Sequence, residues 1–537
     1  MPTHEANWAG ASSANRSPQP DASYRFQSIL FEKPENAQYR EEEPDFFTDL
    51  HLDQIIASIV AGKDEYDLRP FFYTPLRDAA EINYRHGVFR DLEEESLWQS
   101  VQSFAQEMRT MRSDLVRSGK LYYKRQKQSA LLSAAETYCG AIKRLTQDLK
   151  NANLRSRGFA GLSQYLLMYT QSDEFISLTA NTQKVRSDLS SIRYSVHIEG
   201  KRITVDRYHS EPDYGTDVLD TFERFKQGAS RQYQFRYRDT GEMNHVEAAV
   251  LDLVAQAYPD IFAALEQYME RYANFVNPAV AAFDREVQFY VSCMEYIKQF
   301  RGSGLVVCYP VVSPHSKEVY GCDVFDLALA NRLIHEHSPV VTNDFELVSP
   351  ERIMVVSGPN QGGKTTLART FGQMHYLGSI GCPVPGSRAR LFLYDRLFTH
   401  FEREEDLRNL TGKLEDELIR IHRVLEEATP DSILIMNESF LSTTLNDALF
   451  LSKRILERVI ELDLICVTVT FLDELAAMSK TAVSMVSTVD SKDPALRTFK
   501  VVRRTPDGLA YAAAIAEKHG LTYEMVKTRV ARRARKV

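Results

Sequence analysis

Several features that mark other protein classes are missing from this chain. Its 537 residues include six cysteines, which lie far apart without a Cys-x-x-Cys pair, and no run of 18 apolar residues occurs. The cysteine spacing argues against a disulfide framework or a structural zinc, and the missing run argues against a membrane-spanning helix. The first 28 residues lack the basic-then-apolar order of a secretory signal. We therefore expect a soluble, cytoplasmic protein.

Patterns of metal and hydrolytic chemistry are also scarce. The 13 histidines form no His-x-x-x-His pair, and no Gly-x-Ser-x-Gly occurs. The formal net charge of −8 argues against a wholly basic nucleic-acid binder, although a local basic groove remains compatible with it. The hydrophobic share of 44% is that of an ordinary globular protein, and the length predicts two to four domains.

The chain divides by composition and periodicity. Residues 1–45 are rich in Ser, Pro, Asn, Gln and Glu, which predicts a disordered leader. Apolar residues at spacings of three and four predict a helical core over residues 46–120 and long helices over 121–300, the last of them a helical run over 247–300. Alternation near residues 192–207 predicts a β-hairpin. Strands alternating with helices over residues 301–537 predict a parallel, doubly wound α/β sheet.

One stretch carries a clear chemical signature. An apolar strand over residues 353–357 runs into a Gly-x-x-x-x-Gly-Lys-Thr loop and then into helix-forming sequence. The loop residues are Gly358, Pro359, Asn360, Gln361, Gly362, Gly363, Lys364, Thr365 and Thr366. Glycines let successive N–H groups face phosphate oxygens beside a helix N-terminus, Lys364 would reach the β- and γ-phosphates, and Thr365 would hold Mg²⁺. The alternative is a Gly-rich strand-to-helix turn without a ligand.

A second motif follows the strand at residues 432–436. Glu438 is placed to polarise the attacking water, but Asn437 stands where such enzymes carry an Asp for the Mg²⁺ shell. An Asn can hydrogen-bond a metal-bound water but adds no negative charge, so this pattern supports ATP binding more strongly than hydrolysis. A buried strand ending in a surface acid is the simpler interpretation. Thr411 and Gly412 precede an amphipathic helix and could bind a partner subunit's γ-phosphate, or merely cap the helix.

In this order the motifs resemble the MutS family of DNA mismatch-repair ATPases. Residues 358–366 are similar to that family's Gly-Pro-Asn-Met-Gly-Gly-Lys-Ser-Thr, and residues 380–385 to its Ile-Gly-x-x-Val-Pro. The likeness covers residues 305–530, and a Pro-Leu-x-Asp with Glu-Ile-Asn-x-Arg pattern at residues 75–85 extends it into the helical core. The resemblance implies an ABC-type P-loop ATPase domain that ends in a helical dimerisation segment and carries lever helices tipped by a clamp.

The chain also departs from the family pattern. Asn437 replaces the metal-associated Asp, Leu441-Ser442 replaces an Arg-Gly pair, and Phe471 replaces a switch His. No room for the family's mismatch-reading domain is visible before the helical core. The resemblance therefore implies a homodimer with ATP and Mg²⁺ as cofactors and weak turnover, rather than recognition of mismatches.

The expected clamp carries cations. Arg193, Lys201, Arg202 and Arg207 lie in or beside the hairpin and could neutralise DNA phosphates without reading bases. A solvated charged surface offset by acids explains the same residues equally well.

Two functions follow from these observations. The first is an ATP-dependent DNA-binding protein, related to mismatch repair or recombination, in which ATP binding and hydrolysis rearrange levers and clamp. The alternative is a nucleotide-gated scaffold that hardly hydrolyses ATP and recruits a protein partner. A transport-type ATPase fits less well, because no feature that couples to a transmembrane partner is visible.

Overall fold

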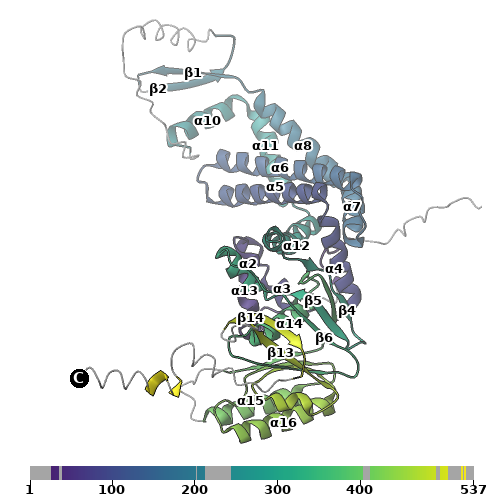
Figure 1. Ribbon diagram of the computed structural model, residues 1–537. Coiled ribbons are helices and arrows are strands. Elements are labelled where there is room, and N and C mark those ends of the chain that lie inside the picture. The colour runs from purple at the N-terminus through teal and green to yellow at the C-terminus, as the bar shows by residue number, and fades with distance from the viewer. Residues whose placement is uncertain are drawn as a thin grey trace, which may run out of the picture.

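A computed structural model describes residues 26–34, 39–200, 202–211, 243–402, 412–490, 496–505, 522–523 and 525–527. The molecule is elongated (Figure 1). A two-stranded hairpin of β1 (Tyr194–Glu199) and β2 (Arg202–Arg207) lies at one end, and α15 (Lys413–Glu427) and α16 (Leu445–Leu462) lie at the other. The hairpin that the alternating pattern predicts is thus present, far from the six-stranded sheet.

Short helices begin the helical half and long ones follow. They are α1 (Phe47–Leu50), α2 (Leu52–Val60), α3 (Arg69–Tyr73), α4 (Ala79–Leu92), α5 (Glu95–Lys120), α6 (Lys124–Asn151), α7 (Arg157–Thr170) and α8 (Asp173–Ser190), with a 3₁₀ turn, η2 (Asp64–Tyr66). Ile55, Ile56 and Ile59 of α2 are buried, as their spacing of three and four predicts. The long helices α5 and α6 are joined by a short connection and pack against each other.

The single helical run expected over residues 247–300 is instead three helices. These are α10 (His245–Ala257), α11 (Pro259–Arg271) and α12 (Pro278–Gly302). Pro259 and Pro278 stand at the first turn of α11 and α12, where a missing N–H is harmless, so each proline starts a new helix. Within the described ranges no helix is by itself long and apolar enough to cross a membrane. Taken as a pair, α10 and α11 pass that test by length and composition, with a bend of 106° between them.

The expected disordered leader is wrong for residues 26–32, here called the N-terminal strap. Phe26, Ile29, Leu30 and Phe31 are buried in the core. The carboxylate of Glu286 on α12 accepts hydrogen bonds from Ser28 Oγ and Ile29 N, both at 2.8 Å. The polar composition around these few apolar residues hides a segment that tertiary contacts order.

The main sheet has six strands in the order β10-β11-β12-β7-β13-β14. Their bounds are β7 (Ile353–Ser357), β10 (Leu397–Phe401), β11 (Ile433–Asn437), β12 (Ile465–Val469), β13 (Ala482–Val489) and β14 (Arg497–Arg503). Neighbours are parallel from β10 to β13, and β14 is antiparallel to β13. All five residues of β7 are buried, because β12 and β13 flank this strand and helices cover both faces.

Alternate residues of β7 belong to two different cores. Met354 and Val356 pack in the large core that includes α14 (Lys364–Ser379), whereas Ile353 and Val355 pack in the core that includes α15 and α16. The strand therefore points side chains to both covered faces and delivers the loop after Ser357 to the carboxyl edge of the sheet. The result is a mixed α/β unit joined to a helical region.

Smaller elements flank the main sheet. A four-stranded sheet has the order β4-β9-β5-β6, and β3 pairs with β8. The bounds are β3 (Val307–Cys308), β4 (Val311–Ser313), β5 (Val319–Val324), β6 (Asn343–Leu347), β8 (Val384–Pro385), β9 (Arg388–Phe392), α13 (Leu327–His335) and the 3₁₀ turn η3 (Asp473–Ala477). Asn343 at the start of β6 binds β14 and so ties the two sheets together beside the Gly-rich loop.

Candidate nucleotide-binding site

The Gly-rich loop joins β7 to α14, as the sequence predicts. Gly358 and Gly363 have φ of 113° and 91°, in the region that only glycine adopts without strain. Gln361 also has a positive φ, of 61°. The loop therefore folds back tightly at the N-terminus of α14, a place where backbone N–H groups and the helix dipole favour an anion.

Two loop glycines are also required by their neighbours. A Cβ on Gly358 would stand 2.6 Å from Ser487 Oγ, and one on Gly362 would stand 2.5 Å from the same atom. A Cβ on Gly363 would lie 3.3 Å from the carbonyl oxygen of Phe499. Strands β13 and β14 therefore pack directly against the loop. They leave no space for a side chain at Gly358 or Gly362 and little at Gly363.

Lys364 is the buried cation of the site, with 4% of its side chain exposed. Its Nζ donates to the Gly358 carbonyl at 2.8 Å and to Asn360 Oδ1 at 3.1 Å, and lies 3.7 Å from Glu438 Oε1. Burial lowers the pKa of Lys364, and the carboxylate of Glu438 opposes that shift. An ammonium group on this short tether could turn its donors toward a phosphate in the loop.

Thr365 and Asn437 meet across the sheet edge. Thr365 Oγ1 donates to Asn437 Oδ1 at 2.8 Å, at the end of β11. Because the hydroxyl is the donor of this hydrogen bond, the lone pairs of its oxygen remain available for a cation. This suits an oxygen-binding ion such as Mg²⁺. Asn437 adds no charge to that ion. The residues thus fit a magnesium site of reduced negative charge.

Glu438 lies on an unusual turn directly after β11. Its φ of 50° and the φ of 65° at Phe440 are both left-handed, and the Glu438 N–H donates to the Val469 carbonyl at 2.9 Å. The Phe440 N–H donates to the buried carboxylate of Glu417 on α15 at 3.0 Å. Burial raises the pKa of Glu417, and this hydrogen bond works against that shift. Strained turns of this kind persist where surrounding contacts hold a functional side chain in place.

A cavity of about 280 Å³ opens beside the loop. Gly363, Thr366, Asn343 and Phe499 are among its lining residues. Phe499 has a φ of 58°, rare for a bulky residue, and half of its surface is exposed. Asn343 holds this conformation, because its Nδ2 donates to the Phe499 carbonyl at 3.1 Å and its Oδ1 accepts from Val501 N at 2.8 Å. No local pattern connects Asn343 with Phe499, because they are 156 residues apart.

Two other predicted residues that the structure describes, Gly412 and Arg207, belong to other elements than the loop. Gly412 is the N-cap of α15, and a Cβ there would meet nothing within 4 Å, while Thr411 lies outside the described residues. Arg207 Nε donates to the Ala257 carbonyl at the end of α10 at 2.7 Å, and its guanidinium stacks 4.7 Å from the Tyr258 ring centroid. Arg207 therefore caps α10 while the residue remains exposed.

The other hairpin cations have a different setting. Arg193 and Arg202 are exposed, Arg202 is paired across the strands with Glu199, and Lys201 lies outside the described residues. Tyr194, Val196 and Ile198 alternate along β1 and are all exposed, Ile198 by 72%. One face of the hairpin is thus apolar, which the charge pattern alone does not predict.

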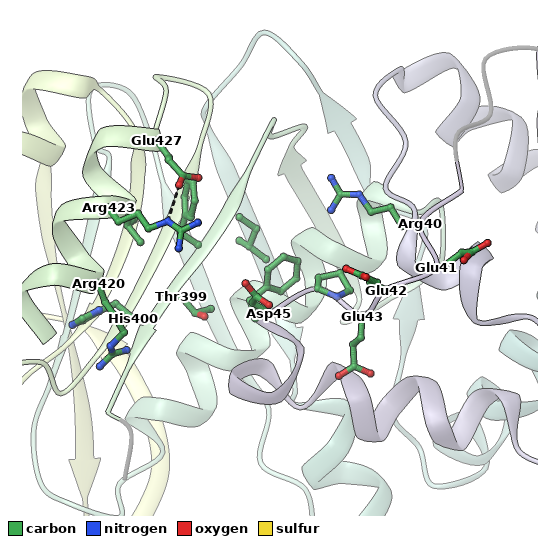
Figure 2. A pocket seen from close by; sticks show the side chains of 15 residues that line it. Arg40, Glu41, Glu42, Glu43, Asp45, Thr399, His400, Arg420, Arg423 and Glu427 are labelled. Atoms are coloured by element: carbon green, nitrogen blue, oxygen red, sulfur yellow. Dashed lines mark hydrogen bonds and ion pairs between the residues drawn. The ribbon is translucent and has the colours of Figure 1, made fainter. Parts of the chain in front are cut away.

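A larger groove of about 800 Å³ lies between residues 40–46 and the α/β unit (Figure 2). Glu42 and Asp45 line one side, and Arg420 and Arg423 of α15 line the other. Arg420 pairs with Asp416, and Arg423 pairs with Glu427. None of the loop residues 358–366 lines this groove, so the chemistry of the site belongs to the smaller cavity.

The Gly-rich loop after a central parallel strand, with a buried lysine at the helix start, defines a P-loop nucleotide-binding protein. Comparison with known families agrees. Residues 354–536 match the model of MutS domain V, which is a P-loop ATPase domain, and residues 77–303 match the MutS2 N-terminal domain. The chain is similar to the MutS family over these two ranges.

Individual relatives are distant. The chain is 32% identical over 199 residues to an endonuclease MutS2 of Thermus thermophilus, a stretch that covers 36% of this chain and 27% of that protein. It is 22% identical over 391 residues to a DNA mismatch repair protein MutS of Petrotoga mobilis, covering 70% of this chain and 45% of that protein. The chain therefore spans less than half the length of these curated relatives.

Proposed function

We propose that this chain binds ATP with Mg²⁺ in a doubly wound, ABC-type domain and uses nucleotide state to move its long helices as levers on DNA. The observation that carries the proposal is the meeting of Lys364, Thr365, Asn437 and Glu438 at one edge of the sheet. Names of the relatives supply the DNA part, since they include DNA mismatch repair protein MutS and endonuclease MutS2.

Each residue of the site has a distinct role in this proposal. Lys364 binds the β- and γ-phosphates together with the N–H groups of residues 358–363. Thr365 holds Mg²⁺, which would neutralise phosphate charge, and Asn437 orients a water bound to that ion. Glu438 accepts a proton from the attacking water. Phe499 offers its exposed ring to the adenine in the 280 Å³ cavity.

Two substitutions separate binding from hydrolysis. Lys364→Ala removes the buried cation, so we expect ATP affinity to fall by at least about 100-fold, because charge-assisted hydrogen bonds to phosphate are lost. Glu438→Gln keeps the shape, so ATP should still bind while turnover falls by about 100-fold or more. Calorimetry and a phosphate-release assay measure the two effects. A Lys364→Ala, Glu438→Gln double variant that binds and hydrolyses ATP like the wild type would refute the site.

The DNA part is tested by turnover with different nucleic acids. ATP hydrolysis by the purified protein is measured alone and with duplex, mismatched, branched and single-stranded DNA. Stimulation by one of them identifies the structure that the levers recognise. In this proposal the active form is a homodimer in which the N-terminus of α15, at Thr411 and Gly412, completes the partner's site.

A nucleotide-gated scaffold is the second candidate, and two observations favour it. Arg207 is used to cap α10, and the exposed face of Tyr194, Val196 and Ile198 suits an apolar partner better than phosphates. DNA binding through the hairpin predicts an affinity that falls with salt, with a shallower slope in Arg202→Ala. Absence of DNA binding at low salt would favour the scaffold.

A further inference from the structure

Ser487 stands behind the phosphate loop without a hydrogen-bond partner. It lies in β13, one residue after Val486, which pairs with Ser357 at the end of β7. The side chain is completely buried, and its Oγ has no partner among the residues that the structure describes. Leaving a buried hydroxyl unpaired is unfavourable by about 1–3 kcal/mol, so such a group calls for an explanation.

The hydroxyl fills the space that two glycines leave. The ideal Cβ positions of Gly358 and Gly362 would both fall within 2.6 Å of Ser487 Oγ. The next nearest atoms are the backbone oxygen and nitrogen of Ser487 for Gly358, and the Pro359 carbonyl oxygen and Ser487 Cβ for Gly362. Ser487 therefore packs against the loop at Gly358 and again at Gly362.

The Gly358 carbonyl is expected to change its hydrogen-bond partner when a nucleotide binds. In the structure the Gly358 carbonyl accepts from Lys364 Nζ at 2.8 Å. When Lys364 turns to a phosphate, this carbonyl, which belongs to a partly buried residue, loses its donor. The Ser487 hydroxyl packs beside the same glycine, within 2.6 Å of where a Cβ would stand, so it is the neighbouring O–H donor that a small shift of the loop could bring to this carbonyl.

We propose that Ser487 is a positioning residue of the phosphate loop, whose hydroxyl donates to the Gly358 backbone once Lys364 has engaged the triphosphate. This inference rests on the proposed ATP-binding function and adds a residue to it. Ser487 touches neither nucleotide nor water; it stabilises the loop conformation that binds phosphate. The bond forms only with nucleotide bound, so it should contribute to affinity and not to the stability of the free protein.

The test compares two serines of the same strand. Ser487→Ala removes the hydroxyl behind the loop, and Ser484→Ala removes one three residues earlier in β13 whose Oγ also has no partner among the described residues. Binding of a fluorescent ATP analogue, the KM and kcat for ATP, and the Tm of the nucleotide-free protein are measured on the full chain. We expect Ser487→Ala to weaken binding and raise KM about tenfold with kcat within about twofold, the effect of one hydrogen bond.

Stability separates positioning from a structural role. The nucleotide-free Tm of Ser487→Ala should equal or exceed that of the wild type, because an unpaired buried hydroxyl is removed, and Ser484→Ala should leave affinity unchanged. Equal affinity of Ser487→Ala and wild type, or a loss of affinity matched by a lower Tm, overturns the inference. If the wild type itself binds no nucleotide, the proposed function fails as well, so the two failures are distinguishable.

Discussion

Asn437 sets the charge of the candidate metal site. It accepts a hydrogen bond from Thr365 at 2.8 Å, which places its amide where a carboxylate would face the ion. An amide oxygen can order a water but cannot offset the charge of a divalent cation. We therefore expect Asn437 to make Mg²⁺ binding weak, while the loop and Lys364 still bind the phosphates.

Asn437→Asp should strengthen magnesium binding. Adding one negative charge beside Thr365 should lower the Mg²⁺ concentration that half-saturates ATP turnover by about tenfold, equivalent to about 1.4 kcal/mol. Magnesium titrations of ATPase rate measure this midpoint. Asn437→Ser is the control, since it adds no charge and should not lower the midpoint; an unchanged midpoint in Asn437→Asp would count against the metal assignment.

Phe499 is expected to contact the base and not the phosphates. Phe499→Ala removes the exposed ring at the 280 Å³ cavity and should weaken ATP binding by about 2- to 10-fold, the usual contribution of one aromatic contact. Binding of tripolyphosphate, which has no base, should stay unchanged. Phe450→Ala removes an exposed ring of α16 outside this cavity and serves as the control. Equal losses for ATP and tripolyphosphate would contradict the base role.

Sequence spacing predicts the residues of this site only where they are neighbours in the chain. The interval from Gly358 to Thr365 carries its own pattern, and Glu438 follows a recognisable apolar strand. Ser487 and Phe499 have no such signal, because each owes its place to pairing between distant segments. Arg207 shows a contact of the same kind: its hydrogen bond to the Ala257 carbonyl of α10 joins residues 50 positions apart, which no local pattern predicts.

At the level of elements, α14 combines phosphate chemistry with a buried histidine. Burial lowers the pKa of His375 to about 4, and its Nε2 has no partner among the described residues. The unfolded chain binds this proton near pH 6.5, so the unfolded state holds more protons between pH 4 and 6.5. Stability is therefore fully present above pH 6.5 and is lost as pH falls toward 4.

Replacing His375 should reduce the loss of the free energy of unfolding as the pH falls below 6.5. At pH 5 the folded protein should have lost about 2 kcal/mol relative to pH 7 through His375 alone. Urea unfolding of His375→Leu at pH 5 and pH 7 should show a difference in the free energy of unfolding that is smaller than the wild-type difference by about 2 kcal/mol. The exposed His315→Gln is the control and should keep the wild-type difference. His86, whose pKa burial lowers to about 3, should add a loss of the same sign.

Elements were predictable where periodicity is strong and unpredictable where tertiary contacts decide. The apolar run over residues 353–357 and the alternation near 192–207 predict β7 and the hairpin. The break of one expected helix into α10, α11 and α12 follows from Pro259 and Pro278, which periodicity alone passes over. Strand order in the sheet depends on pairing between distant segments, and no local pattern contains it.

At the level of the whole molecule, Arg85 connects the N-terminal strap to both halves. Arg85 on α4 donates from Nε to the Leu30 carbonyl of the strap at 3.0 Å and from Nη1 to the Ile380 carbonyl at the end of α14 at 2.8 Å. Tyr290 on α12 donates to the Ile29 carbonyl at 2.7 Å. One buried arginine thus connects the helical region, the strap and the helix that begins at the phosphate loop.

Matched truncations test this role. Deleting residues 1–32 removes the strap and exposes its pocket, so the free energy of unfolding should fall by about 3 kcal/mol or more, the usual cost of emptying a site of large apolar side chains. Deleting residues 1–25 removes none of the described contacts and should leave stability unchanged. Chemical denaturation measures both. Equal stability of the two truncations would show that the strap adds nothing.

The strap also constrains the order of events during synthesis. Ser28 and its acceptor Glu286 are separated by 258 positions, and Ile380 is further away still. At a translation rate of about 5–20 residues per second, the strap leaves the ribosome about 13–50 seconds before α12 exists to receive it. Its four large apolar side chains lack their α12 contacts through that interval. We therefore expect them to be binding sites for a chaperone on the nascent chain.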